Sequence, residues 1–110
     1  MTYTPDSWVV INIGEHWKVL ATWYGSYLLG DDWRLSSGVD GIIEEDTYWV
    51  ISNVSGSTYI CYKSAEGLSS LGADILTNLQ KIANVEVKNA NEVYGYFNIS
   101  SRLSAGAVGA

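Results

Sequence analysis

The apolar residues of this chain come in short runs that end at glycine, asparagine or serine, a pattern typical of strands. One run, Ser7–Ile13, ends at Gly14. The next, His16–Tyr24, alternates in character, which is the period of a strand with two different faces. We expect its odd-numbered positions to face the core. The glycine and acid between the two runs predict a tight hairpin.

Glycines divide the middle of the chain. They bracket Tyr27–Leu29, which is too short for anything but an edge strand or a loop crossing. Glycines at such spacing mark bulges or bends, so we expect the sheet to curl here. Beyond the bend, residues 42–43, Thr47–Ser52 and Ser57–Lys63 are rich in aromatic and β-branched residues and are joined by short polar turns. This arrangement predicts a meander of three strands.

The period of the apolar positions changes after Lys63. Apolar residues now recur at spacings of three and four: Leu68, Leu71, Ile75, Leu79 and Ile82. This spacing predicts a helix over Leu68–Val85 that packs one face on a sheet. Either Ser69 or Ser70 can cap its first turn by accepting backbone N–H bonds.

The last part of the chain predicts a second hairpin. Two runs, Val85–Lys88 and Glu92–Ile99, flank asparagines that tolerate left-handed geometry. The sequence therefore predicts an α+β fold, a curved antiparallel β-sheet of about six strands with one amphipathic helix packed on it. Residues 1–103 are expected to form a single domain, and residues 104–110 a flexible C-terminal tail.

Charge and composition narrow the function classes. The 110 residues carry a net charge of -6, which opposes binding to nucleic acid or to an anionic membrane. Cys61 is the only cysteine, so no internal disulfide forms, and no Cys or His cluster predicts a zinc site. We expect no cofactor. The first residues lack the regions of a signal peptide, so we expect a cytoplasmic location.

Candidate catalytic groups are few. His16 is the only histidine, and the strand assignment separates it from Cys61, so a nucleophile and base pair is not predicted. Acidic residues that could gather around calcium or serve glycoside hydrolysis show no defining spacing, and we expect them to be solvated: Asp31, Asp32, Asp40, Glu44, Glu45 and Asp46. No phosphate loop, dinucleotide fingerprint or nucleophile elbow is present. The chain is predicted not to be an enzyme.

Arg34 lies between acids and beside Trp33. One interpretation is structural: the guanidinium fixes a bend by an ion pair with Asp31 or Asp32 and by stacking on the neighbouring ring. The alternative is that Arg34 binds a carboxylate or phosphate of a ligand, assisted by Ser36, by Ser37 and by the backbone of residue 38.

The five tryptophans and eight tyrosines exceed what one small core comfortably buries. We predict that some of them form a surface that binds a protein partner or a second copy of the chain, which would make a homo-oligomer. The alternative is a small-ligand or carbohydrate-binding domain, in which Trp33 and Tyr27 stack on a sugar while Asp31 and Arg34 form hydrogen bonds. The predicted binding residues are Tyr24, Tyr27, Asp31, Trp33, Arg34 and Ser36.

Several segments resemble a group of short uncharacterised proteins of tailed bacteriophages. The resemblance lies in residues 17–20, 25–28 and 30–39, which read W-x-x-L, G-x-Y-L and G-D-x-W-R-L-x-S-G-V. It continues through Tyr48-Trp49 and Ser55–Lys63, covers under half of the chain and ends before Leu68. The resemblance implies a phage or environmental origin, an accessory role and, for a phage-encoded protein, the host cytoplasm. It implies no functional residue, because the group has no established activity.

Overall fold

The computed structural model describes residues 1–25 and 30–98, and these residues form two sheets, two α-helices and one short 3-10 helix. The strands are β1 (Thr2–Tyr3), β2 (Ser7–Ile13), β3 (His16–Trp23), β4 (Asp32–Leu35), β5 (Val39–Glu44), β6 (Tyr48–Asn53), β7 (Thr58–Tyr62) and β8 (Val85–Lys88). The helical elements are the short 3-10 helix η1 (Lys63–Ala65), α1 (Ser70–Gln80) and a C-terminal helix over residues 90–98. The α+β class is confirmed.

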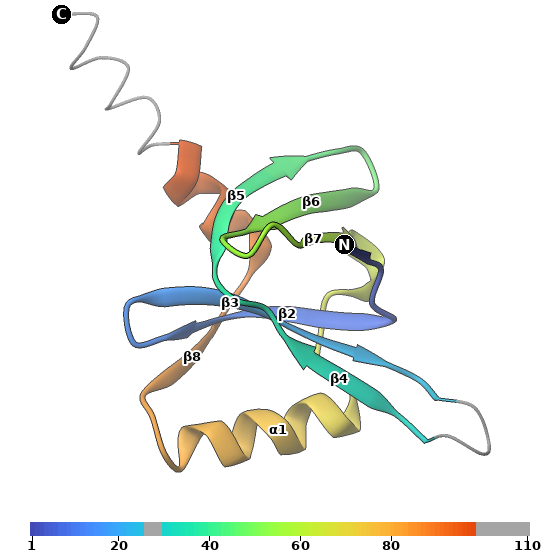
Figure 1. The fold of residues 1–110 in the computed structure, drawn as a ribbon, viewed down its shortest axis with the longest axis vertical. Coiled ribbons are helices and arrows are strands. Elements are labelled where there is room, and N and C mark those ends of the chain that lie inside the picture. The colour runs from blue at the N-terminus through green and yellow to red at the C-terminus, as the bar shows by residue number, and fades with distance from the viewer. Residues whose placement is uncertain (26–29, 99–110) are drawn as a thin grey trace, which may run out of the picture.

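The strands form two sheets of four rather than one. The central sheet has the order β4-β3-β2-β8, and the outer sheet has the order β1-β7-β6-β5. Figure 1 shows the central sheet between the outer sheet and α1. The predicted single sheet of about six strands is therefore wrong. The chain leaves the central sheet after β4 and enters the outer sheet as β5. Strand β8 coincides with the predicted run Val85–Lys88, but it pairs with β2 rather than with residues 92–99. The short pairing of β1 with β7 is not predicted by the sequence.

Both faces of the central sheet are buried. Odd positions of β3, such as Val19 and Ala21, pack with the outer sheet in the larger core. Leu20 belongs instead to a second core with Leu76 of α1. The expectation that the odd positions face a core is confirmed, and the helix buries the opposite face as well.

The local signals at the first hairpin and at α1 are confirmed. Gly14 has φ 62°, a left-handed value that glycine adopts without strain, and Ile13 pairs with His16 across the two-residue turn. Ser69 caps α1, because its Oγ accepts a hydrogen bond from Gly72 N at 3.1 Å. Helix α1 ends at Gln80, well before the predicted end.

The β5–β6–β7 meander is confirmed by its antiparallel pairing. The predicted strand over residues 92–99 is wrong, because residues 90–98 are helical. Asn89 begins this helix: its Oδ1 accepts from Glu92 N at 2.9 Å, and its Nδ2 donates to Glu92 Oε1 at 2.9 Å. Glu66, distant in sequence, accepts from Ala90 N at 2.9 Å. These caps satisfy backbone groups that a helix start leaves without partners.

Two predictions fall on residues that the structure does not describe. Residues 27–29, predicted as an edge strand or loop, lie outside the described part of the chain, as does the predicted domain boundary at residue 103. In the described part, no helix has the length and apolar character needed to cross a membrane.

Replacing the cap of the C-terminal helix tests its contribution to stability. In Asn89→Ala, the N–H of Glu92 loses its side-chain acceptor, and we expect the free energy of unfolding to fall by about 1 kcal/mol. Urea denaturation followed by circular dichroism measures this. Asn91→Ala is the matched control, since Asn91 is an exposed helical residue whose replacement should leave stability nearly unchanged. Equal stability of the two variants would contradict the capping role.

Candidate functional site

The predicted aromatic and arginine surface is divided between the two faces of β4. Successive side chains of a strand point to opposite faces. Leu35 belongs to the core beneath α1, so Trp33 lies on the α1 side of the sheet, where it is 43% exposed. Arg34 lies on the other side and places its guanidinium carbon 4.6 Å from the centre of the Tyr3 ring. The two residues therefore do not form one binding surface.

Arg34 stacks on a tyrosine that belongs to an aromatic cluster. The Tyr3 ring lies 6.2 Å from Trp23 and 5.1 Å from Tyr59, measured between ring centres. The ion pairs found within residues 1–25 and 30–98 do not include Arg34. Asp31 instead accepts a hydrogen bond from Gly25 N at 3.1 Å. In the described structure the stacking partner is Tyr3 rather than Trp33, and the predicted ion pair is not formed.

Ser36 is buried, with 3% of its surface exposed. Its Oγ accepts a hydrogen bond from Val19 N at 2.8 Å, and its N–H donates to Val19 O at 2.9 Å. The side chain thus completes the pairing of β3 where β4 ends, and it is not presented to a ligand. Tyr24 is 62% exposed, whereas Tyr27 lies outside the described residues.

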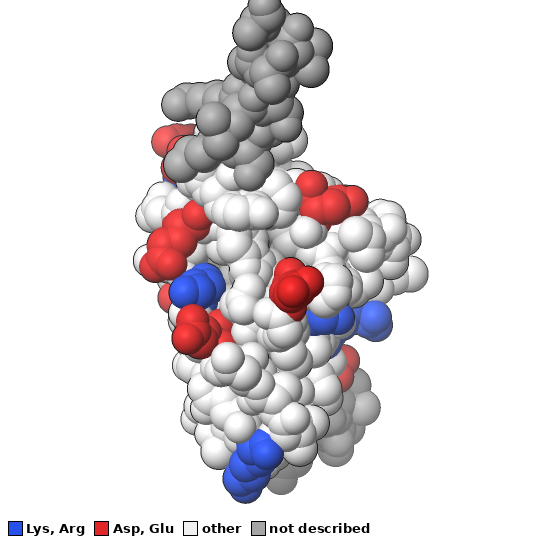
Figure 2. Space-filling view, turned by 90° about the vertical axis from the view of Figure 1, so that its left-hand side faces the viewer, with Lys and Arg blue, Asp and Glu red and all other residues white. Residues whose placement is uncertain are grey.

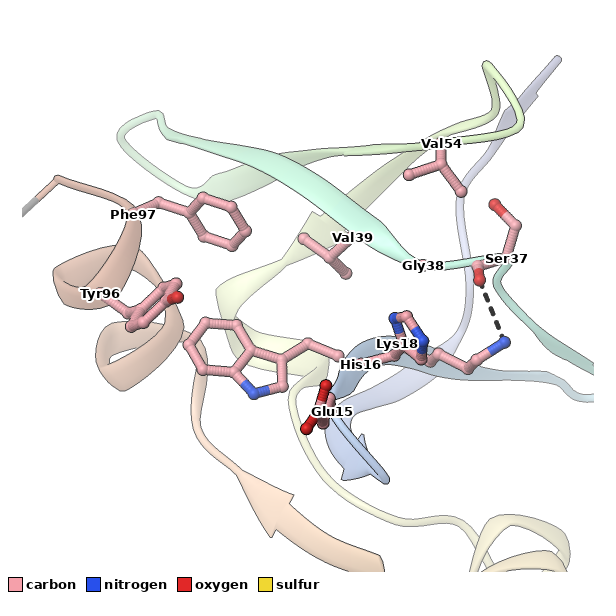
Figure 3. Close-up of a pocket in the computed structure, with 10 residues that line it drawn as sticks. Glu15, His16, Lys18, Ser37, Gly38, Val39, Val54, Tyr96 and Phe97 are labelled. Atoms are coloured by element: carbon pink, nitrogen blue, oxygen red, sulfur yellow. Dashed lines mark hydrogen bonds between the residues drawn. The ribbon is translucent and has the colours of Figure 1, made fainter. Parts of the chain in front are cut away.

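A pocket of about 490 Å³ lies at the point where β4 leaves β3. The turn between β2 and β3, the beginning of β5, the turn after β6 and the C-terminal helix surround it (Figure 3). Its lining includes His16, Trp17, Lys18, Val39, Tyr96 and Phe97. A volume of this size is within the range of small-molecule and side-chain binding pockets.

Trp17, Tyr96 and Phe97, here called the aromatic trio, pack edge to face along the pocket. The ring centres of Trp17 and Tyr96 are 4.4 Å apart, and those of Trp17 and Phe97 are 5.6 Å apart. With its amide oriented to satisfy both polar atoms, Asn12 accepts from Trp17 Nε1 and donates to Gly14 O at 3.2 Å. Tyr96 remains 55% exposed. The trio therefore combines a fixed indole with an accessible phenol ring.

Polar groups line the rim of the pocket. Lys18 Nζ donates to Ser37 O at 3.0 Å, and Figure 3 shows this side chain reaching toward the segment that leads into β5. Glu15 and His16 are exposed at the hairpin turn. The rim thus offers an acid, an imidazole and a cation around an apolar floor, which suits recognition of a ligand with both apolar and polar parts.

Other charged groups are dispersed. On the face shown in Figure 2, basic side chains are separated by acidic and uncharged ones rather than gathered into a patch. Within the described ranges, no three His, Cys, Asp or Glu side chains lie close enough together to hold a metal ion.

Cys61 lies fully buried in the core between the two sheets, so its thiol is not accessible to a substrate. Burial raises the pKa of its thiol well above the ordinary value of 9.0, and the nearby negative charge of Glu66 raises it further. The thiol is therefore protonated in the folded protein and is a poor nucleophile.

Sequence reasoning missed the contribution of the C-terminal helix to the pocket. Tyr96 and Phe97 fall in the run Glu92–Ile99, which is predicted to be the second strand of a hairpin because the asparagines before it tolerate left-handed geometry. A usable signal was present: Asn89 and Glu92 have the spacing of a capping pair, and the apolar residues Val93 and Phe97 recur at a helical interval.

No protein-family model matches the chain, and neither does any curated protein or solved structure.

The buried thiol predicts a loss of stability at alkaline pH. Burial raises the pKa of Cys61 and also that of Tyr59, so the unfolded chain loses these protons at lower pH than the folded protein. We expect the melting temperature to be insensitive to these groups below about pH 8 and to fall as pH rises past about 9. The fall in melting temperature with pH should be less steep in Cys61→Ala, because this variant lacks the buried thiol. A thiol reagent should modify Cys61 only when the protein unfolds, and rapid modification of native protein would contradict this burial.

Proposed function

We propose that this protein is a non-catalytic binding module that accepts part of a protein partner in the pocket of the aromatic trio. The observation that supports this most directly is the position of Tyr96, which is 55% exposed while its ring contacts Trp17 at the pocket. Exposed aromatic rings beside a preformed pocket are typical anchors of protein interfaces.

The arrangement of titratable groups supports a role without catalysis. Among the described residues, no side-chain hydrogen bond orients His16 or Glu15. The ammonium of Lys18 is bound to Ser37 O, and the thiol of Cys61 is buried. A nucleophile and base held within hydrogen-bonding reach, which covalent catalysis requires, is not assembled in this part of the chain.

A second candidate is a carbohydrate-binding domain. It is favoured by the combination of the accessible Tyr96 ring with the rim groups Glu15, His16 and Ser37. A sugar can stack its apolar face on an aromatic ring while polar side chains bind its hydroxyl groups. This candidate uses the pocket rather than the predicted platform of Trp33 and Tyr27.

We also propose that Tyr24 and Trp33, the exposed aromatics of the predicted surface, contribute to self-association. The resemblance to tailed-phage proteins adds the proposal of an accessory role, carried out in the cytoplasm of a host cell. The proposal of self-association rests on the exposure of these two rings, and the proposal of an accessory role rests on the sequence resemblance alone.

Selection from a displayed library of random octapeptides tests the pocket as the binding site. We expect enriched peptides to lose at least about tenfold in affinity for Tyr96→Ala, because the anchor ring is removed, and to retain affinity for Trp33→Ala. Fluorescence polarisation measures both. Loss with Trp33→Ala alone would place binding at the β3–β4 hairpin. Binding of the protein to a glycan array, with no peptide enriched from the library, would favour the carbohydrate-binding candidate.

Light scattering coupled to size-exclusion chromatography tests self-association. We expect the mass to increase with protein concentration in the wild-type protein, and to remain that of one chain in Trp33→Ala, because the exposed indole would be lost from the contact. Tyr62→Ala, which removes an exposed ring from the outer sheet, is the control. A single-chain mass for the wild-type protein throughout the concentration series would contradict the proposal.

A further inference from the structure

Strand β3 is paired on only part of one side. On one side, β3 pairs with β2 from His16 to Thr22. On the other side it pairs with β4 only from Trp23 to Leu20, and the described chain then crosses to the outer sheet. On the β4 side, the first residues of β3 therefore have no strand beside them among the residues described.

The hydrogen bonds at the end of β4 show which backbone groups point to this unpaired side. Ser36 N donates to Val19 O at 2.9 Å, and Val19 N donates to Ser36 Oγ at 2.8 Å. Alternate residues of an antiparallel strand direct their N–H and C=O groups to the same side. The backbone N–H and C=O of Trp17 therefore point in the same direction as those of Val19, beyond the end of β4.

Nearby acceptors in the crossing segment are already bound. Lys18 Nζ donates to Ser37 O at 3.0 Å, and Val54 N donates to Gly38 O at 2.9 Å. The pocket is also lined from both faces of β3, by Trp17 on one and by His16 and Lys18 on the other. Lining from both faces is what an opening at a strand edge produces.

We propose that the pocket binds an extended segment of a partner protein, which adds a short strand to β3 by pairing with the backbone of Trp17. This rests on the proposed function and specifies its partner. An extended peptide presents a donor and an acceptor at the spacing of a strand, and its side chains alternate. One side chain, apolar, would contact the aromatic trio. The net charge of -6 favours a segment that is neutral or basic.

Hydrogen exchange of the free protein tests whether this edge is open. Lys18 and Leu20 direct their N–H groups toward β2, so their amides should exchange slowly, while the amide of Trp17 should exchange at least about tenfold faster. A Trp17 amide protected to the same degree as that of Lys18 in the free protein would overturn the inference.

The complex with the tightest octapeptide from the displayed library provides the second test. We expect protection of the Trp17 amide to rise at least about tenfold on binding, and N-methylation of one central peptide amide to weaken binding about three- to tenfold. A peptide N-methylated at its terminal amide is the control. Tyr62→Ala removes an exposed ring that does not line the pocket, and this variant should show the same increase in protection.

The outcomes separate the inference from the proposed function. One outcome is that the selected peptides depend on Tyr96 for binding but leave the Trp17 amide unprotected and tolerate N-methylation at every position. That result would overturn strand addition, while the pocket would still be a protein-binding site. If no selected peptide depends on Tyr96, the proposed function fails as well. Circular dichroism of Tyr96→Ala verifies folding, which we expect to be retained because the ring is more than half exposed.

Discussion

Burial of the central sheet on both faces is the constraint on which the rest of the structure depends. Neighbouring residues of β3 serve different cores: Val19 packs toward the outer sheet, and Leu20 packs toward α1. Strands buried on both sides need a covering layer on each. The outer sheet, formed by β1, β5, β6 and β7, covers one face of the central sheet, and α1 covers the other. The arrangement of three layers follows from this double burial.

The candidate site arises where this layering changes. The chain leaves the central sheet at Ser36, whose side chain takes the place of a strand partner for Val19. The C-terminal helix then packs its aromatic residues beside the unpaired part of β3, and Trp17 becomes the contact between them. The pocket is therefore a product of an incomplete strand pairing and a helix that covers only part of the gap.

The aromatic residues differ in how far they are buried. Trp8 and Trp49 are fully buried and belong to the core between the sheets. Trp33 and the tyrosines 24 and 96 remain exposed, so the prediction of aromatic rings left over after the core is filled agrees with the structure. Their positions were not predictable from composition, because alternation along β4 places Trp33 and Arg34 on opposite faces.

The sequence by itself determined the α+β class, the first hairpin, the meander and α1, because turn residues, strand alternation and the helical period are local properties. The tertiary structure alone decided the division into two sheets, since which strands pair depends on distant contacts. It also decided that residues 90–98 form a helix. Their aromatic content favours a strand, but the caps from Asn89 and Glu66 and the packing against the larger core stabilise a helix. The pocket depends on that helix, so it emerges only when the chain is folded.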